Sequence, residues 1–151
     1  MKRYVLLTLL VLSLVLVACA SDSTTETAPE PKAVTLIATD IAYDVEQIEA
    51  SVGQPVQLTL ENQGVLEHDF SIVEIPLSGE VVTLEEAGEM AGHDMGHDMG
   101  HEEDEPDVHI AVPTTDRGTI EFTPAAPGEY VYYCTVSGHR EAGMEGVLVV
   151  K

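Results

Sequence analysis

Three side chains that can bind soft metals lie close together near the C-terminus. Cys134, His139 and Met144 follow the spacing C-x4-H-x4-M, which places a thiol, an imidazole and a thioether within eleven residues. Soft sulfur ligands select copper(I), and imidazole binds copper in both oxidation states. A fourth ligand must come from elsewhere, and His68 is the best candidate because it follows a strand-like segment and the loop Asn62-Gln63-Gly64. This set predicts a copper site.

The beginning of the chain has the pattern of a bacterial export signal. Lys2 and Arg3 precede an apolar run at residues 5–18. These fourteen residues are too few to span a bilayer comfortably, but they fit the apolar core of a secretory signal peptide. The run ends in the letters LVAC, which resemble the lipobox of bacterial lipoproteins. We therefore expect a signal peptide at residues 1–18 and a lipid on Cys19.

Cys134 has no disulfide partner within the chain if Cys19 carries a lipid. An unpaired cysteine outside the cytoplasm is either open to oxidation or held by another group. A small buried apolar residue is the alternative interpretation of Cys134. The neighbouring His139 and Met144 favour a metal thiolate.

Short β-strands separated by turn residues make up the rest of the pattern. Residues 19–32 are polar and contain proline, which is typical of a flexible tether. We expect one domain at residues 33–151, because that length fits one domain and not two. Several short strands with turns between them indicate an all-β sandwich. The expected strands are Val34–Ala38, Val56–Leu60, His68–Ile75, Thr119–Phe122, Tyr130–Cys134 and Gly146–Val150.

An acidic insert at residues 79–107 interrupts this rhythm. It holds eleven acidic residues, no basic residue, and a tandem Gly-His-Asp-Met repeat. We expect it to protrude without contributing to the core, and residues 82–91 could form one or two helical turns. Histidine-rich tracts commonly bind metals, so the insert could be a second copper site, a copper-capture arm or a solvated spacer. Its candidate ligands are Met90, His93, Met95, His97, Met99 and His101.

The segment NQGVLEHDF at residues 62–70, together with Cys134–Met144, resembles the cupredoxins, the small blue copper proteins. The likeness covers residues 33–75 and 113–151 and leaves the insert unmatched. Within the family it is nearer to plastocyanin, auracyanin and sulfocyanin than to the multidomain oxidases, and the spacing C-x4-H-x4-M is of the auracyanin kind. The resemblance implies a Greek-key β-sandwich with one copper ion at a type 1 site.

The resemblance also implies a role for each ligand. His68, Cys134 and His139 would surround copper in one plane, and Met144 would be the long axial ligand. Asp69 would bind the backbone and hydroxyl of Thr135, and such outer contacts orient metal ligands. An ordinary solvated carboxylate is the alternative for Asp69.

Two further groups have simpler interpretations. His109 follows the acidic run, and we expect a strand histidine with a satisfied hydrogen bond there rather than a site residue. Tyr130, Tyr132 and Tyr133 are expected to be strand residues, with Tyr130 and Tyr132 on one face and Tyr133 on the other.

Charge and the closed ligand set narrow the function. The chain has 27 acidic and 6 basic residues, a formal net charge of −21, which argues against binding nucleic acid or anionic lipid heads. If the protein fills all four coordination positions, no open position remains for a substrate, so we do not expect an enzyme.

We expect a monomeric electron carrier, lipid-anchored on the outer face of the cell membrane or in the periplasm. Its acidic surface would steer it to basic patches on membrane redox complexes. The alternative is copper storage, resistance or delivery through the insert.

Overall fold

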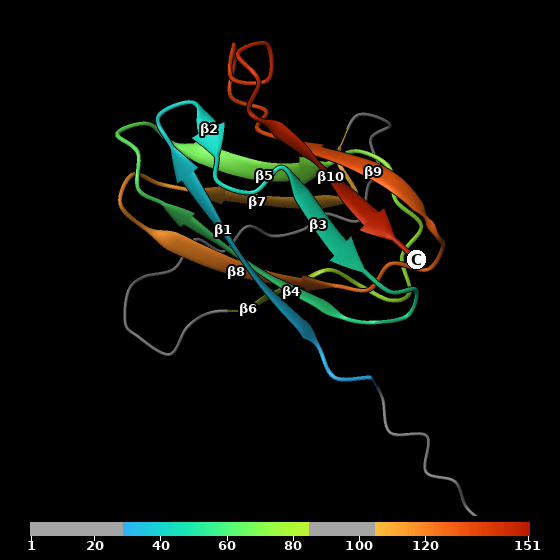
Figure 1. The fold of residues 1–151 in the computed structure, drawn as a ribbon. Helices are drawn as coiled ribbons and strands as arrows, with labels where there is room; N and C mark the ends of the chain where they lie inside the picture. The colour runs from blue at the N-terminus through green and yellow to red at the C-terminus, as the bar shows by residue number, and fades with distance from the viewer. Residues whose placement is uncertain (1–28, 85–104) are drawn as a thin grey trace, which may run out of the picture.

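The computed structural model describes residues 29–84 and 105–151, and within them the chain forms two five-stranded β-sheets packed face to face (Figure 1). The expected all-β sandwich is therefore confirmed, and no helix occurs in the described ranges. Consequently, no helix there is long and apolar enough to cross a membrane.

The first sheet has the strand order β2-β1-β4-β8-β6. Its strands β1 and β4 run parallel, whereas β8 is antiparallel to both β4 and β6. The bounds are β1 Lys32–Thr39, β2 Ala42–Tyr43, β4 Val56–Asn62, β6 Val82–Leu84 and β8 Arg117–Phe122. Alternate residues of β4 are buried, from Val56 through Leu58 and Leu60 to Asn62, because side chains of a strand point to opposite faces in turn.

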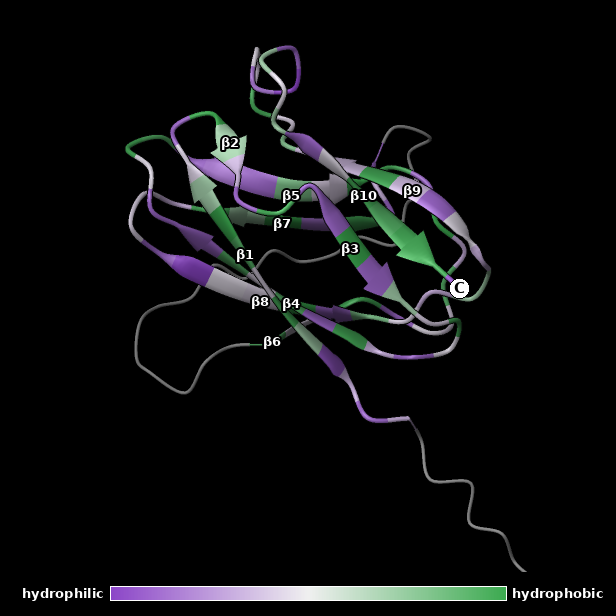
Figure 2. Ribbon diagram, viewed as in Figure 1, coloured by the Kyte–Doolittle hydropathy of each residue, from purple (hydrophilic) through white to green (hydrophobic). Residues whose placement is uncertain are grey.

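The second sheet has the order β3-β10-β9-β5-β7 and carries the predicted ligands. Its strands are β3 Gln47–Ala50, β5 His68–Ile72, β7 Val108–Val112, β9 Gly128–Tyr133 and β10 Glu145–Val150. All five residues of β5 are buried, whereas β3 alternates between exposed and buried residues. Hydrophilic and hydrophobic colours alternate along β3 in Figure 2. Strand β5 is thus covered on both faces, and its outward side chains need polar partners.

Aromatic rings fill the space between the sheets near β9. Tyr132 is fully buried, with its ring centroid 5.1 Å from that of Phe70 and 5.7 Å from that of Tyr43. Tyr133 lies on the opposite face of β9 and is partly exposed. The expected division of the tyrosines between the two faces is confirmed.

The ends of the acidic insert differ from the prediction. Val82–Leu84 forms β6 and pairs with β8, so these residues are a strand and not the start of a helical turn. At the other end, the carboxylate of Asp107 accepts a 2.7 Å hydrogen bond from the backbone N–H of Ile75. The expectation that the whole segment 79–107 stands apart from the sandwich is wrong at both ends. Pairing with β8 joins one end to the first sheet, and hydrogen bonds of Asp107 with Val73 and Ile75 hold the other.

Candidate metal centre

The predicted ligands come from three neighbouring strands of one sheet. His68 begins β5, Cys134 follows the last residue of β9, and Met144 precedes β10. Because β9 is antiparallel to both β5 and β10, the start of β5, the end of β9 and the start of β10 meet at one end of the sheet. The loop 134–144 lies at the top of Figure 1, at this end.

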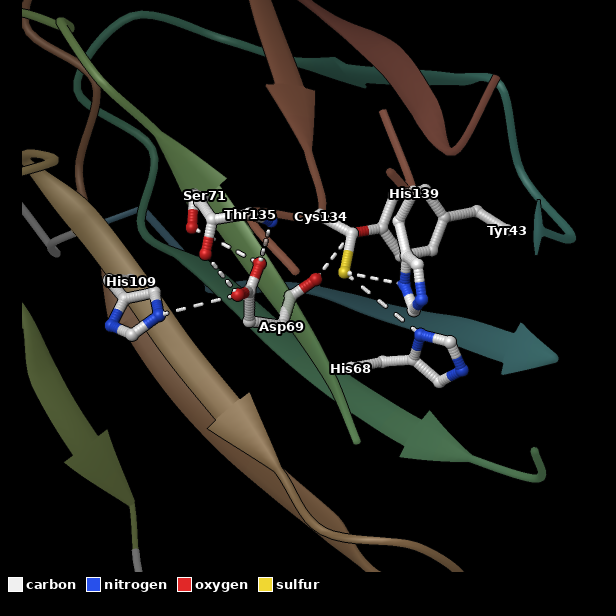
Figure 3. A network of polar contacts seen from close by, with 8 residues as sticks. All are labelled: Tyr43, His68, Asp69, Ser71, His109, Cys134, Thr135 and His139. Carbon is white, nitrogen blue, oxygen red and sulfur yellow. Dashed lines mark hydrogen bonds and ion pairs between the residues drawn. The ribbon is translucent and has the colours of Figure 1, made fainter. Parts of the chain in front are cut away.

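Three donor atoms converge there. The Sγ atom of Cys134 lies 3.4 Å from Nδ1 of His139 and 4.0 Å from Nδ1 of His68, and the three donor groups lie within 4.8 Å of one another. Figure 3 shows both imidazole rings turned toward the sulfur. Cys134 and His68 are fully buried, and His139 is 5% exposed. Within the part of the chain that the structure describes, His68, Cys134 and His139 are close enough together to hold a metal ion.

Backbone hydrogen bonds fold the loop so that its ends meet. The N–H of Cys134 donates to the carbonyl of Met144 at 3.1 Å, and the N–H of Met144 donates to that of His139 at 3.0 Å. Gly138 and Gly143 have φ angles of 85° and 100°, a conformation that glycine adopts without steric cost. The Met144 side chain is fully buried. The loop therefore brings its cysteine, histidine and methionine to the same end of the sandwich.

Asn62 fixes the loop before His68, and the sequence interpretation gave it no role. Its Nδ2 donates to the carbonyls of Leu66, Val112 and Pro113 at 2.8, 3.0 and 3.1 Å, and its Oδ1 accepts from the N–H of Gly64 at 2.9 Å. A signal was present, because Asn62 occupies the buried register of β4 after three apolar residues. A polar residue there must find partners in the interior.

His68 has one nitrogen facing the cysteine and one without a partner. Its Nε2 is buried without a hydrogen bond within the described ranges. A Cβ on Gly64 would lie 3.0 Å from this nitrogen, so glycine leaves the ring its space. Burial, followed by the proximity of His139, lowers the pKa of His68. The imidazole is therefore neutral near pH 7, with an electron pair available for a metal.

Asp69 links the first ligand strand to the residue after Cys134. Its carboxylate accepts hydrogen bonds from the Thr135 N–H at 2.7 Å and from the Thr135 hydroxyl, as the resemblance implied (Figure 3). Burial would raise the pKa of Asp69, but contacts with His109 and Thr135 outweigh it and lower that pKa. Asp69 is only 4% exposed, so the alternative of a solvated carboxylate is wrong.

His109 is a strand residue, as expected, but its contact with Asp69 is too long for the expected hydrogen bond. It lies in β7 opposite Ser71, and its Nε2 is 3.9 Å from Oδ2 of Asp69, with the side chain 44% exposed. This is an ion-pair distance rather than a hydrogen bond. Tyr43 adds a contact that the sequence did not predict, because its hydroxyl donates to the backbone carbonyl of Asp69.

The donor set fits copper. A buried thiol with two imidazoles offers soft and borderline ligands, and such sets favour copper over the oxygen-binding cations. Burial raises the pKa of Cys134, so a bound metal must displace the thiol proton. The remaining candidate residues, Cys19, Met90, His93, Met95, His97, Met99 and His101, lie outside the described residues.

Fold and site together define a cupredoxin, a blue copper protein, and the cofactor is copper. The pattern of the multicopper oxidase family matches residues 20–151, and the chain belongs to that family.

The chain is also similar to individual proteins in sequence and in structure. Auracyanin-B of Chloroflexus aurantiacus is 49% identical over 35 residues, which are 23% of this chain and only 15% of that protein. The reduced auracyanin of Roseiflexus castenholzii has a TM-score of 0.58 at 21% identity, over 80% of this chain and 97% of that one. A multicopper oxidase of Campylobacter jejuni has a TM-score of 0.58 at 15% identity, over 85% of this chain but 31% of that one.

Proposed function

We propose that this chain carries single electrons outside the cytoplasm at a type 1 copper site. His68, Cys134 and His139 would bind copper in one plane, with Met144 as the axial ligand. Copper supplies the redox chemistry by alternating between its +1 and +2 states. The protein residues bind the ion, keep water away from it and hold the donor atoms in one arrangement.

The burial of the donor groups is the observation that carries this proposal. Cys134, His68 and Met144 are fully buried, and His139 is nearly so. A substrate needs an open coordination position, as catalytic zinc sites keep and structural ones do not. Four protein donors would fill the site, which suits electron transfer better than catalysis. The likeness to auracyanins, the blue copper proteins named above, supports the same choice over an oxidase.

Anchoring, location and partners belong to the same proposal. The LVAC motif supports a lipid on Cys19, which would hold the domain at the outer face of the cell membrane or in the periplasm. Because the full chain has 27 acidic and 6 basic residues, the protein would be steered toward basic patches on membrane electron-transfer complexes. It would act there as a monomer.

Copper storage, resistance or delivery is the second candidate, and the insert supports it. The tandem Gly-His-Asp-Met repeat and its flanking residues place three histidines and three methionines within residues 90–101. A carrier with a complete site does not need these additional ligands. The two functions could be served by different parts of one chain.

Copper loading followed by redox cycling tests the electron-carrier proposal. Adding copper(II) to the full chain should give an intense blue thiolate-to-copper band, which Cys134→Ser should abolish. Reduction and reoxidation by small outer-sphere reagents should bleach and restore the band repeatedly without copper loss. A colourless product would overturn the ligand assignment. A blue protein that loses copper on each reduction would overturn electron carriage.

A further inference from the structure

Three side chains outside the copper pocket contact one another on the outer face of the β9–β10 pair. The guanidinium carbon of Arg140 lies 3.9 Å from the ring centroid of Tyr133. Its Nε lies 3.3 Å from Oε2 of Glu145. Tyr133 and Glu145 are directly opposite each other in the strand register, so Arg140 covers a cross-strand pair.

Each of these residues adjoins a predicted ligand in the chain. Tyr133 precedes Cys134, Arg140 follows His139, and Glu145 follows Met144. The contacts between the three side chains therefore connect the peptide segments that carry three of the four donors. Two of these segments are strand ends, which the sheet already holds. The third, with His139, is in the middle of the loop.

We propose that Tyr133, Arg140 and Glu145 form a clasp that positions His139 against the strand ends and slows the release of copper. Arg140 is the positioning residue, because its side chain connects the middle of the loop to β9 and β10. The inference rests on the proposed copper ligands and does not depend on electron carriage.

Stacking should contribute more to the clasp than charge. The side chains of Arg140 and Glu145 are each 49% exposed, and exposed ion pairs contribute little. A planar guanidinium over an aromatic face has a favourable electrostatic contact that the ammonium of lysine reproduces poorly. The ring of Tyr133 should therefore matter more than the carboxylate of Glu145.

Copper release requires the loop to open, so its rate should follow the open fraction. Losing one exposed cation–π contact should raise that fraction about two- to fivefold. The experiment loads the full chain with copper(II), adds excess chelator and follows the decay of the blue band. Arg140→Ala and Tyr133→Leu should each accelerate the decay by this factor, and the double variant should be no faster than either single variant.

Conservative variants and a matched control separate positioning from a general loss of stability. Tyr133→Phe keeps the ring and should decay at the rate of the unchanged protein, whereas Arg140→Lys should decay nearly as fast as Arg140→Ala. Lys151→Ala removes another exposed ion pair, with Glu49 at 2.7 Å, at the far end of β10, and should leave the decay rate unchanged. The thiolate band of Arg140→Ala should also shift, because His139 loses one of the contacts that position it.

Several outcomes would overturn the clasp. These are an Arg140→Ala decay equal to that of Lys151→Ala, a Tyr133→Phe decay as fast as that of Tyr133→Leu, or additive effects in the double variant. Absence of a blue band from the unchanged chain would instead contradict the ligand assignment. Failure of redox cycling with normal decay rates would contradict electron carriage alone.

Discussion

At the scale of single residues, the copper site depends on buried groups whose charge changes with pH. His68 has a pKa below its ordinary 6.5 because of burial and then His139. Asp69 has a pKa below its ordinary 3.8, because contacts with His109 and Thr135 outweigh burial. In both cases the unfolded chain binds the proton more readily than the folded chain. Stability is therefore greatest above the ordinary pKa and is lost as the pH falls.

The copper-free protein should show this loss in two steps. We expect the free energy of unfolding to decrease as the pH falls below about 6.5, where the unfolded chain protonates His68. A second decrease should begin near pH 4 and include Asp69. Denaturant unfolding across a pH series measures both. Asp69→Asn should reduce the decrease near pH 4 and keep the decrease below about pH 6.5. If the decrease near pH 4 is unchanged in that variant, the role given to Asp69 is wrong.

Met144 should tune the site without being essential to it. Its side chain is fully buried, and leucine has a similar volume, so Met144→Leu should cost less than about 1.5 kcal/mol in unfolding free energy. An axial thioether is a weak donor that stabilises copper(II). Its loss should therefore raise the reduction potential and leave the blue band in place, as voltammetry and visible spectra would show. Loss of the blue band would mean that Met144 does more than this.

At the scale of elements, the sequence predicts the longer strands and misses the short strands β2, β3 and β6. Strand β4 was predictable from Val56, Leu58 and Leu60. Strands β2 and β6 have only two and three residues at sheet edges, and they form because β1 and β8 offer backbone partners. The same division holds at the site. Spacing identified Cys134, His139 and Met144. The buried register of Asn62 indicated a polar residue in need of partners, but the main-chain carbonyls that it binds could not be identified from the sequence.

The pairing of β9 with β10 requires a glycine at position 146. Gly146 lies opposite Tyr132 in the register, and a Cβ there would overlap the fully buried Tyr132 ring, which would have to shift. Gly143, by contrast, has open space around its Cβ position, and only its φ of 100° opposes a side chain. Close packing therefore requires glycine at position 146, whereas backbone conformation favours it at position 143.

Alanine at these positions should separate the two effects. Gly143→Ala should cost about 1–2 kcal/mol of unfolding free energy from backbone strain. Gly146→Ala should cost more, about 2–3 kcal/mol, because overpacking displaces a core ring. Thermal and denaturant unfolding of the copper-free protein measure both. Equal costs would contradict the close packing of Tyr132 against β10.

At the scale of the whole molecule, the sandwich encloses the copper site. The acidic insert connects β6, an edge strand of the first sheet, to β7, an edge strand of the second. Residues from both ends of the insert, including Val81, Thr83 and Glu105, line one cavity of about 500 Å³ together with His109. The two ends of the insert therefore lie around the same hollow. A short linker could replace residues 85–104 without disturbing β6 or the Asp107 contact to Ile75.

Such a deletion tests whether the insert binds copper. The proposed blue-site ligands lie outside residues 85–104, so the blue band should be unchanged. Copper bound per chain in excess metal at neutral pH should fall from more than one to one, as elemental analysis after dialysis would show. Imidazoles bind metal only when neutral, so the additional copper should also be lost as the pH falls through the histidine range. Replacing His93, His97 and His101 with glutamine keeps the insert's length and is the matched control. If the full chain binds only one copper, the insert is a spacer and copper storage loses its main support.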